Sequence, residues 1–259
     1  MHGADAAILA HLTPLAFAFV LVLCRVSAAV MLMPGLGEAE PPPMLRAGFA
    51  LALTVLLLPA VQPMLPAVPF DIWPLARMAA AELLAGGLLG WLARLVALSL
   101  PIAGQFISYM LGLSSVLVPD ATFGGQGTAT SRLFGIAAPV LILGSGLYAL
   151  PLSALAGSYA VFPAGAVLPA SDAATVVVSA VGESFSLALR LAAPFLIAGL
   201  VWQVALGLLA RLVPTLQVFF IAQPGQILGG LLLLMLVAGA LLVAWSSAAH
   251  DAFSVLPGL

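Results

Sequence analysis

The chain has 259 residues, of which 64% are hydrophobic and only 6% are charged, whereas an ordinary soluble domain carries about a quarter charged residues. A chain of this length cannot bury so much apolar surface in one core, so the composition excludes a water-soluble protein and indicates a membrane protein. All seven basic residues are arginines, the net charge is -2 and Cys24 is the one cysteine, which excludes a basic surface for nucleic acid, an internal disulfide and a multi-cysteine metal site.

The first apolar stretch, residues 12–33, has the length of a membrane-spanning helix. Its apolar run 15–23 and the small residues 27–29 resemble a signal peptide with a cleavage site. However, no basic residue precedes the run, and the charged Arg25 lies between the run and the small residues, where signal peptides are normally uncharged. We therefore expect a retained first helix.

Six more apolar stretches follow along the chain. A span needs about 20 residues and some stretches are shorter, so the pattern predicts an all-α fold with about six membrane-spanning helices. The loops between them are rich in proline and glycine and shorter than a folded domain, which indicates a single domain over residues 1–259. The stretches are 44–58, 78–100, 102–118, 133–150, 187–209 and 227–245.

Prolines interrupt several of these stretches. Each proline lacks a backbone donor and tends to kink or break a helix, and a break at membrane depth must be covered by protein or face water. We therefore expect broken helices, which suit either a transporter or a subunit that is covered by partner proteins. The prolines are Pro59, Pro101, Pro139, Pro151 and Pro163.

Two arginines are expected to mark the ends of one span. Arg190 and Arg211 lie about 31 Å apart along a helix, close to the hydrocarbon thickness of about 30 Å. Pro194 would lie near the start of this helix and Pro214 just beyond its end. The arginines in the loops do not favour one orientation in the membrane.

Glu82 is a charged residue within an apolar stretch, where a charge costs about 2.5–3.5 kcal/mol at the centre of a span. Gly86 and Gly90 follow at intervals of four residues and allow a neighbouring helix to approach closely. This stripe predicts helix packing around one buried polar group. The alternative is an ion pathway in a secondary transporter, but neither a repeat between the halves nor a polar midplane site accompanies it.

The sequence offers little for catalysis. His2, His11 and His250 lie near the termini, and Ser145, which stands between two glycines, has no histidine suited to complete the dyad of an intramembrane protease. We predict no catalytic residue, no cofactor and no metal site.

Arginines, prolines and glycines punctuate the whole chain in a distinctive order. An arginine in the first helix precedes a proline-glycine break, and a second element runs from proline to arginine. The third stretch, which contains the acidic residue Glu82, comes next. A central segment over residues 103–120 and a proline-containing run over residues 190–224 follow it. The residues expected to serve packing are Arg25, Pro34, Gly35, Arg46, Glu82, Gly86, Gly90, Arg190, Pro194, Arg211 and Pro214.

This order resembles that of the FliR family of flagellar type III export proteins over residues 15–236. Two positions depart from the family, because Gln226 stands where a lysine is often found and Leu147 where a histidine is often found. The resemblance implies a non-enzymatic subunit of the export gate, which forms part of the channel through which unfolded flagellar proteins cross the bacterial inner membrane at the flagellar basal body.

The resemblance also implies the partners. Family members assemble as tilted helical hairpins with FliP-like and FliQ-like sister proteins and a larger FlhB-like protein, so these, the unfolded export substrates and membrane lipid are expected to contact the chain. The homologous injectisome subunit of the SctT family is the alternative to a flagellar role, and a small-molecule transporter is a further one.

The family's closed pore is blocked by a loop, and the matching segment here is residues 111–123. Small and polar residues favour an adaptable backbone, and apolar residues suit a seal against water and ions; residues 124–127 are expected to form a mobile loop. The alternative is an ordinary buried helix end. The candidate plug residues are Leu111, Gly112, Leu113, Ser114, Ser115, Val116, Leu117, Val118, Pro119 and Phe123.

Overall fold

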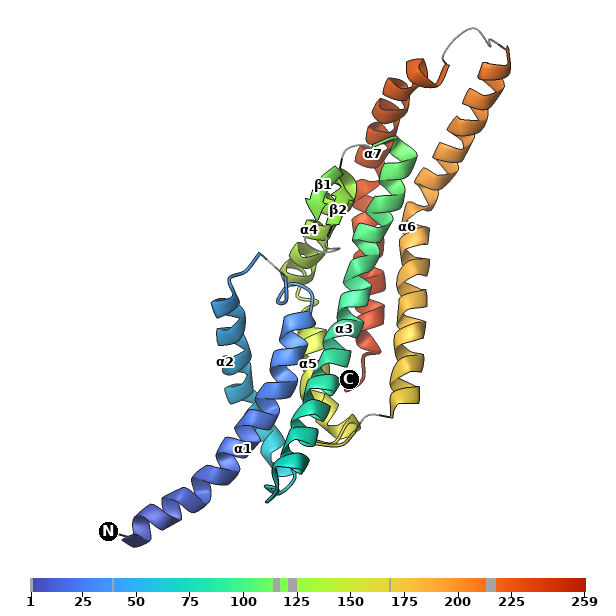
Figure 1. Cartoon of the computed structure of the whole chain (residues 1–259). Coiled ribbons are helices and arrows are strands. Elements are labelled where there is room, and N and C mark those ends of the chain that lie inside the picture. The colour runs from blue at the N-terminus through green and yellow to red at the C-terminus, as the bar shows by residue number, and fades with distance from the viewer. Residues whose placement is uncertain (1, 39, 114–116, 121–124, 168, 213–217) are drawn as a thin grey trace. The chain divides into compact units, whose positions relative to one another are not determined.

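The structure is a computed structural model that describes residues 2–38, 40–113, 117–120, 125–167, 169–212 and 218–259. It is built almost entirely of helices (Figure 1), which confirms the expected all-α class. One short two-stranded hairpin, which the sequence analysis does not predict, interrupts them. The helices are α1 His2–Leu32, α2 Pro43–Val61, the 3-10 turn η1 Gln62–Met64, α3 Ile72–Leu111, α4 Ala129–Gly144, α5 Ala149–Val161, α6 Ala170–Leu212 and α7 Val218–Ser254, and the strands are β1 Leu117–Asp120 and β2 Gly125–Thr128.

Within the described residues, five helical segments are long and apolar enough to cross a membrane, or six if α4 and α5 together form one bent span. This agrees with the expected number of about six. A helix satisfies its backbone hydrogen bonds internally, which is why apolar sequence of this length adopts it in lipid. The five segments are Leu12–Leu32, Pro43–Met64, Ile72–Leu111, Ala170–Leu212 and Phe220–Ser254.

Most prolines do not break the helices, and the expectation of breaks at Pro59, Pro101 and Pro139 is wrong. Helices α2, α3 and α4 each continue through one of these prolines. Pro151 lies in the first turn of α5, where its missing amide proton has no helical partner to lose. Pro163 follows the last residue of α5.

Around Pro101, hydroxyl groups bond to carbonyls in the preceding turn of α3. Ser99 donates a hydrogen bond to the carbonyl oxygen of Val96 at 2.6 Å, and Ser184 of α6 donates one to that of Leu95 at 2.6 Å. Trp245 of α7 donates its indole N–H to the Ser99 hydroxyl at 3.0 Å. The carbonyl that loses its helical donor at Pro101 is that of Ala97, four residues before it, so these bonds tie α3 to α6 and α7 and do not replace the lost bond.

Two of the turns between helices contain a glycine in the left-handed region. Gly35 lies just beyond α1 with φ +83°, and Gly146 lies between α4 and α5 with φ +81°. Both backbones are in the left-handed region, which glycine enters without the steric cost that a Cβ imposes. These positions set the turns after α1 and between α4 and α5.

The chain divides into two compact units. The first unit comprises Met1–Arg94, Ser145–Ser179 and Ala252–Leu259, and the second comprises Leu95–Gly144 and Ala180–Asp251. In the first unit α1 and α2 lie side by side as a hairpin (Figure 1), and their core includes Val26, Val30, Leu89 and Leu155. In the second, buried residues of α3, α6 and α7 include Leu100, Ile107, Phe195 and Trp245.

Candidate functional site

Helix α3 ends in a hydrogen-bonded C-terminal cap at Gly112 and Leu113, where the candidate plug begins. The amide of Leu113 donates a hydrogen bond to the carbonyl of Ser108 at 3.0 Å, and the amide of Gly112 donates one to that of Tyr109 at 3.3 Å. These two bonds define a Schellman cap, which needs a residue in the left-handed region, and Gly112 has φ +76°. The chain therefore leaves the helix axis at a fixed point.

The segment beyond the cap returns as an antiparallel hairpin. Strand β1 pairs with β2, so that Leu117 lies opposite Thr128 and Asp120 lies opposite Gly125. Thr128 then starts α4, because its hydroxyl accepts a hydrogen bond from the amide of Ser131 at 3.4 Å, as an N-cap residue does. The hairpin thus leads directly into the next helix.

The end of the hairpin is tied back to α3. The side-chain oxygen of Gln105 accepts hydrogen bonds from the amide of Thr128 at 3.5 Å and from its hydroxyl at 3.2 Å. The hydroxyl of Thr130 donates to the carbonyl of Gly104 at 3.0 Å. Residues 112–128 therefore leave from and return to the last two turns of α3.

The structure places only part of the candidate plug. Leu111 is buried at the end of α3, and Leu117, Val118 and Pro119 lie in β1. The expectation of a mobile loop at 124–127 is wrong for residues 125–127, which pair with β1. Four-residue strands that contain proline or two glycines give weak strand signals. Four members of the plug, Ser114, Ser115, Val116 and Phe123, lie outside the described residues.

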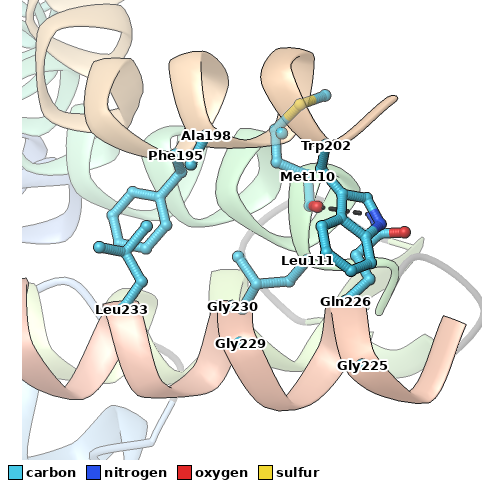
Figure 2. Close-up of a pocket in the computed structure, with 11 residues that line it drawn as sticks. Met110, Leu111, Phe195, Ala198, Trp202, Gly225, Gln226, Gly229, Gly230 and Leu233 are labelled. Carbon is cyan, nitrogen blue, oxygen red and sulfur yellow. Dashed lines mark hydrogen bonds between the residues drawn. The ribbon is translucent and has the colours of Figure 1, made fainter. Parts of the chain in front are cut away.

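The last two residues of α3 lie against a glycine of α6 and a glycine of α7, and Figure 2 shows Leu111 beside Gly230 of α7. A Cβ on Gly199 would lie 2.7 Å from the sulfur of Met110, and one on Gly230 would lie 2.5 Å from Cγ of Leu111. Gln226, one of the two departures from the family pattern, donates its amide N–H to the carbonyl oxygen of Met110 at 2.8 Å. We call these contacts the seat of α3.

A cavity of about 120 Å³ borders the seat, and Figure 2 shows the residues that line it. Met110, Leu111 and Gln226 face it together with Trp202 and Ala198. The indole N–H of Trp202 is buried and has no hydrogen-bond partner among the described residues. The seat therefore combines one satisfied carbonyl with unfilled space and an unused donor.

The first unit contains a buried ion pair that sequence reasoning does not predict. Nε of Arg25 lies 2.8 Å from one carboxylate oxygen of Glu82, and a terminal nitrogen of Arg25 lies 3.0 Å from the other. Both side chains are 1% exposed. The bidentate geometry is the strongest that arginine and a carboxylate form. It places the expected polar anchor of α3 against α1.

Further groups complete this ion pair. Arg25 also donates to the Ser158 hydroxyl at 3.1 Å and to the carbonyl of Phe162 at 3.0 Å, and its guanidinium lies 3.9 Å from the centre of the Tyr159 ring. Glu82 accepts a hydrogen bond from the amide of Gly165 at 2.7 Å. We call this set the arginine cluster; it joins α1, α3, α5 and the turn after α5.

The glycine stripe of α3 packs against α1 next to the arginine cluster. A Cβ on Gly86 would overlap the carbonyl oxygen of Arg25, and one on Gly90 would lie 2.6 Å from the carbonyl oxygen of Ala29. The two helices are therefore close enough for their backbones to meet, as small residues allow in membrane proteins. Nearby, Arg94 pairs with Glu38 at 3.3 Å.

The other residues expected to serve packing have different surroundings. Pro34 and Gly35 lie in the turn after α1, and Nε of Arg46 is buried without a partner among the described residues. Helix α6 extends far beyond the expected span, so Arg190 and Pro194 lie in its interior and are exposed, while only Arg211 lies in its last turn. The expectation that Arg190 marks a helix end is therefore wrong, because apolar and small residues continue the helix to Ala170. Pro214 lies outside the described residues, and Leu147 is buried.

Large apolar side chains remain exposed along α6 and α7. Leu200, Val204 and Leu208 of α6 are 57–66% exposed, and Leu232 and Met235 of α7 are 61% and 81% exposed. Contiguous apolar surface of this kind requires lipid or another protein to cover it.

The described structure defines the class of an integral membrane protein made of long apolar helices, with a hairpin loop held on the end of one of them. The chain belongs to the bacterial export proteins, family 1, whose sequence profile matches residues 16–252. It is 35% identical over 226 residues to the flagellar biosynthetic protein FliR of Caulobacter vibrioides, covering 87% of this chain and 90% of the relative.

More distant relatives come from both flagellar and translocation systems. The chain is 27% identical to the flagellar biosynthetic protein FliR of Bacillus subtilis, over 87% of this chain and 88% of the relative. It is also 27% identical to the Yop proteins translocation protein T of Yersinia pestis, over 80% of each. These matches confirm the resemblance to the FliR family that the order of arginines, prolines and glycines indicates.

Proposed function

We propose that this protein is a non-enzymatic core subunit of the flagellar type III export gate, in the bacterial inner membrane at the basal body. The whole chain would act as one export-gate domain that forms part of the channel for unfolded flagellar proteins. The observation that carries this proposal is the match to family 1 of the bacterial export proteins over residues 16–252, together with 35% identity to a flagellar FliR.

The exposed apolar helices support a role within an assembly. FliP-like and FliQ-like sister proteins are proposed to cover α6 and α7, with a FlhB-like protein as a further partner and lipid as the remaining cover. Such faces can pack against helices of other subunits, and van der Waals packing drives this association within lipid.

The hairpin loop is proposed to plug the closed channel. Both of its ends are fixed on the last two turns of α3 through Gly104, Gln105 and the cap at Gly112. A loop that is anchored at both ends stays attached to its helices, which a seal at a channel requires.

The test is to co-express the chain with its FliP-like and FliQ-like partners, measure the complex by native mass spectrometry, and reconstitute it in liposomes. Deleting residues 114–118 should leave the complex intact and raise ion leakage, while a deletion of equal length at residues 65–69, in the loop after η1, should not. A chain that never joins the partners would contradict the gate assignment. Unchanged leakage from an intact complex that lacks residues 114–118 would contradict the plug.

An injectisome role is the second candidate, favoured by the 27% identity to the Yop proteins translocation protein T. The higher identity to a FliR favours the flagellar system. The chain should therefore restore flagellum assembly in a Caulobacter vibrioides strain without its FliR. Restoration of Yop secretion in a Yersinia strain without translocation protein T, with no restoration of flagella, would reverse this preference.

A further inference from the structure

The seat of α3 joins α7 to the last turn of α3, from which the hairpin loop (residues 112–128) leaves the helix. Met110 and Leu111 are the last residues of α3, and the cap at Gly112 follows directly. A displacement of this last turn would be transmitted to the loop, because the cap fixes the direction in which the chain leaves the helix.

A specific polar contact holds this turn. The last four carbonyls of a helix lack helical donors, and the carbonyl of Met110 finds its donor in the side chain of Gln226 at 2.8 Å. The dashed line in Figure 2 marks this bond across the seat. The contacts of Met110 with Gly199 and of Leu111 with Gly230 are apolar and do not fix the depth of the turn in the same way.

The surroundings leave room for a second position of the turn. The cavity of about 120 Å³ lies directly beside Met110 and Leu111 and is partly open at the surface of the chain, where Ala198 is exposed. The buried indole N–H of Trp202 on its wall is unused among the described residues. A buried unpaired donor is unfavourable, so an arrangement that brings a carbonyl of the last turn to Trp202 would recover that loss.

We propose that Gln226 is the latch of the gate: its hydrogen bond to Met110 holds the last turn of α3 in the closed position, and opening moves this turn into the neighbouring cavity. The inference rests on the proposed function, because it assigns a gating role to the loop that the turn carries. Gln226 is a positioning residue, since it acts on the loop through α3.

The first test compares two substitutions of Gln226 in the assembled gate. Gln226→Leu removes the donor at similar size, whereas Gln226→Lys keeps a donor whose positive charge is favourable at a helix C-terminus. Hydrogen exchange at the amides of Gly112 and Leu113 should accelerate about five- to tenfold in Gln226→Leu, the factor expected for one net hydrogen bond, and remain near wild type in Gln226→Lys. Ion leakage should rise by a similar factor in the leucine variant only.

The second test fills the cavity, which should hinder opening, whereas the first test favours opening. Ala198 lines the cavity and is exposed at its edge, so Ala198→Leu should occupy the space that the turn needs and reduce export at least several-fold without leakage. Gly239→Ala is the control for folding in the helix that carries Gln226, because a Cβ there would meet nothing within 4 Å.

The results distinguish failure of the proposed role of Gln226 from failure of the proposed export-gate function. If the deletion of residues 114–118 leaks while Gln226→Leu shows wild-type exchange and leakage, the latch is wrong and the gate stands. If Gln226→Lys behaves like Gln226→Leu, the position tolerates no change of any kind and the role of the donor is refuted. If neither the deletion nor Gln226→Leu leaks from an intact complex, the plug and its latch fail together.

Discussion

The arginine cluster of the first unit and the seat of α3 in the second unit are two polar sites among apolar helices, and they differ in charge. In the first unit, Arg25 and Glu82 form a bidentate ion pair that also bonds to Ser158, Phe162 and Gly165. In the second, the neutral side chain of Gln226 bonds one carbonyl beside a cavity and an unused indole N–H.

The difference separates a fixed region from an adjustable one. An ion pair with 1% exposed side chains cannot open without leaving a charge in an apolar interior, which costs several kcal/mol. A neutral hydrogen bond is worth only about 1 kcal/mol net, and another donor can replace it. The arginine cluster therefore suits a permanent joint between helices, and the seat of α3 suits a part that moves.

The largest expected effect comes from breaking the arginine cluster. Glu82→Leu leaves the charge of Arg25 buried and should lower the free energy of unfolding by about 3–5 kcal/mol. The measurement is unfolding of the purified protein in bicelles, together with the amount of folded protein recovered from membranes.

The matched control replaces both partners. Arg25→Met combined with Glu82→Leu removes both charges and should recover most of the lost free energy, because apolar replacement of a whole buried ion pair is often neutral or stabilising. If the double variant is less stable than Glu82→Leu alone, the cluster is not the charge-balanced joint that its geometry indicates.

A smaller effect is expected from the close approach of α1 and α3. In Gly86→Ala the new methyl group would overlap the carbonyl oxygen of Arg25, whereas in Gly87→Ala it would lie 3.9 Å from a methyl carbon of Leu32. Overpacking costs about 1–3 kcal/mol, so the melting temperature should fall in the first variant and hardly change in the second. Equal melting temperatures would show that the two helices can separate at little cost.

Sequence reasoning predicts the parts of this fold that depend on composition and local pattern. Apolar stretches of span length predict the helices, and glycines at intervals of four residues predict the face of α3 that meets a neighbour. The fixed order of arginines, prolines and glycines resembles one family, which the family match confirms over residues 16–252.

The parts that sequence reasoning misses depend on contacts between distant segments. Pro101 predicts a break, but α3 continues through it, and the bonds from Ser184 and Trp245 to this part of α3 come from other helices. Arg25 and Glu82 are 57 positions apart, and no local spacing relates them. Gln226 attracts notice only as a departure from a family pattern, and its partner is a backbone carbonyl, which no sequence motif identifies.

The smallest predicted effect contrasts two tryptophans of the second unit. The indole N–H of Trp245 bonds to Ser99 at 3.0 Å, whereas that of Trp202 is buried without a partner among the described residues. Replacement by phenylalanine removes the same ring atoms at both sites, but Trp245 is fully buried whereas Trp202 is half-buried beside the cavity, so lost packing adds to the lost hydrogen bond at Trp245. Trp245→Phe should lower the free energy of unfolding by at least about 1 kcal/mol more than Trp202→Phe.

The same pair tests the contrast between the two polar clusters. If Trp202→Phe is neutral or stabilising in the isolated protein yet slows opening in the assembled gate, the unused donor serves the open position, because the closed position gains nothing from it. If Trp202→Phe destabilises the isolated protein as much as Trp245→Phe does, the indole N–H is already engaged in the closed position. The seat of α3 would then be a second fixed joint between helices.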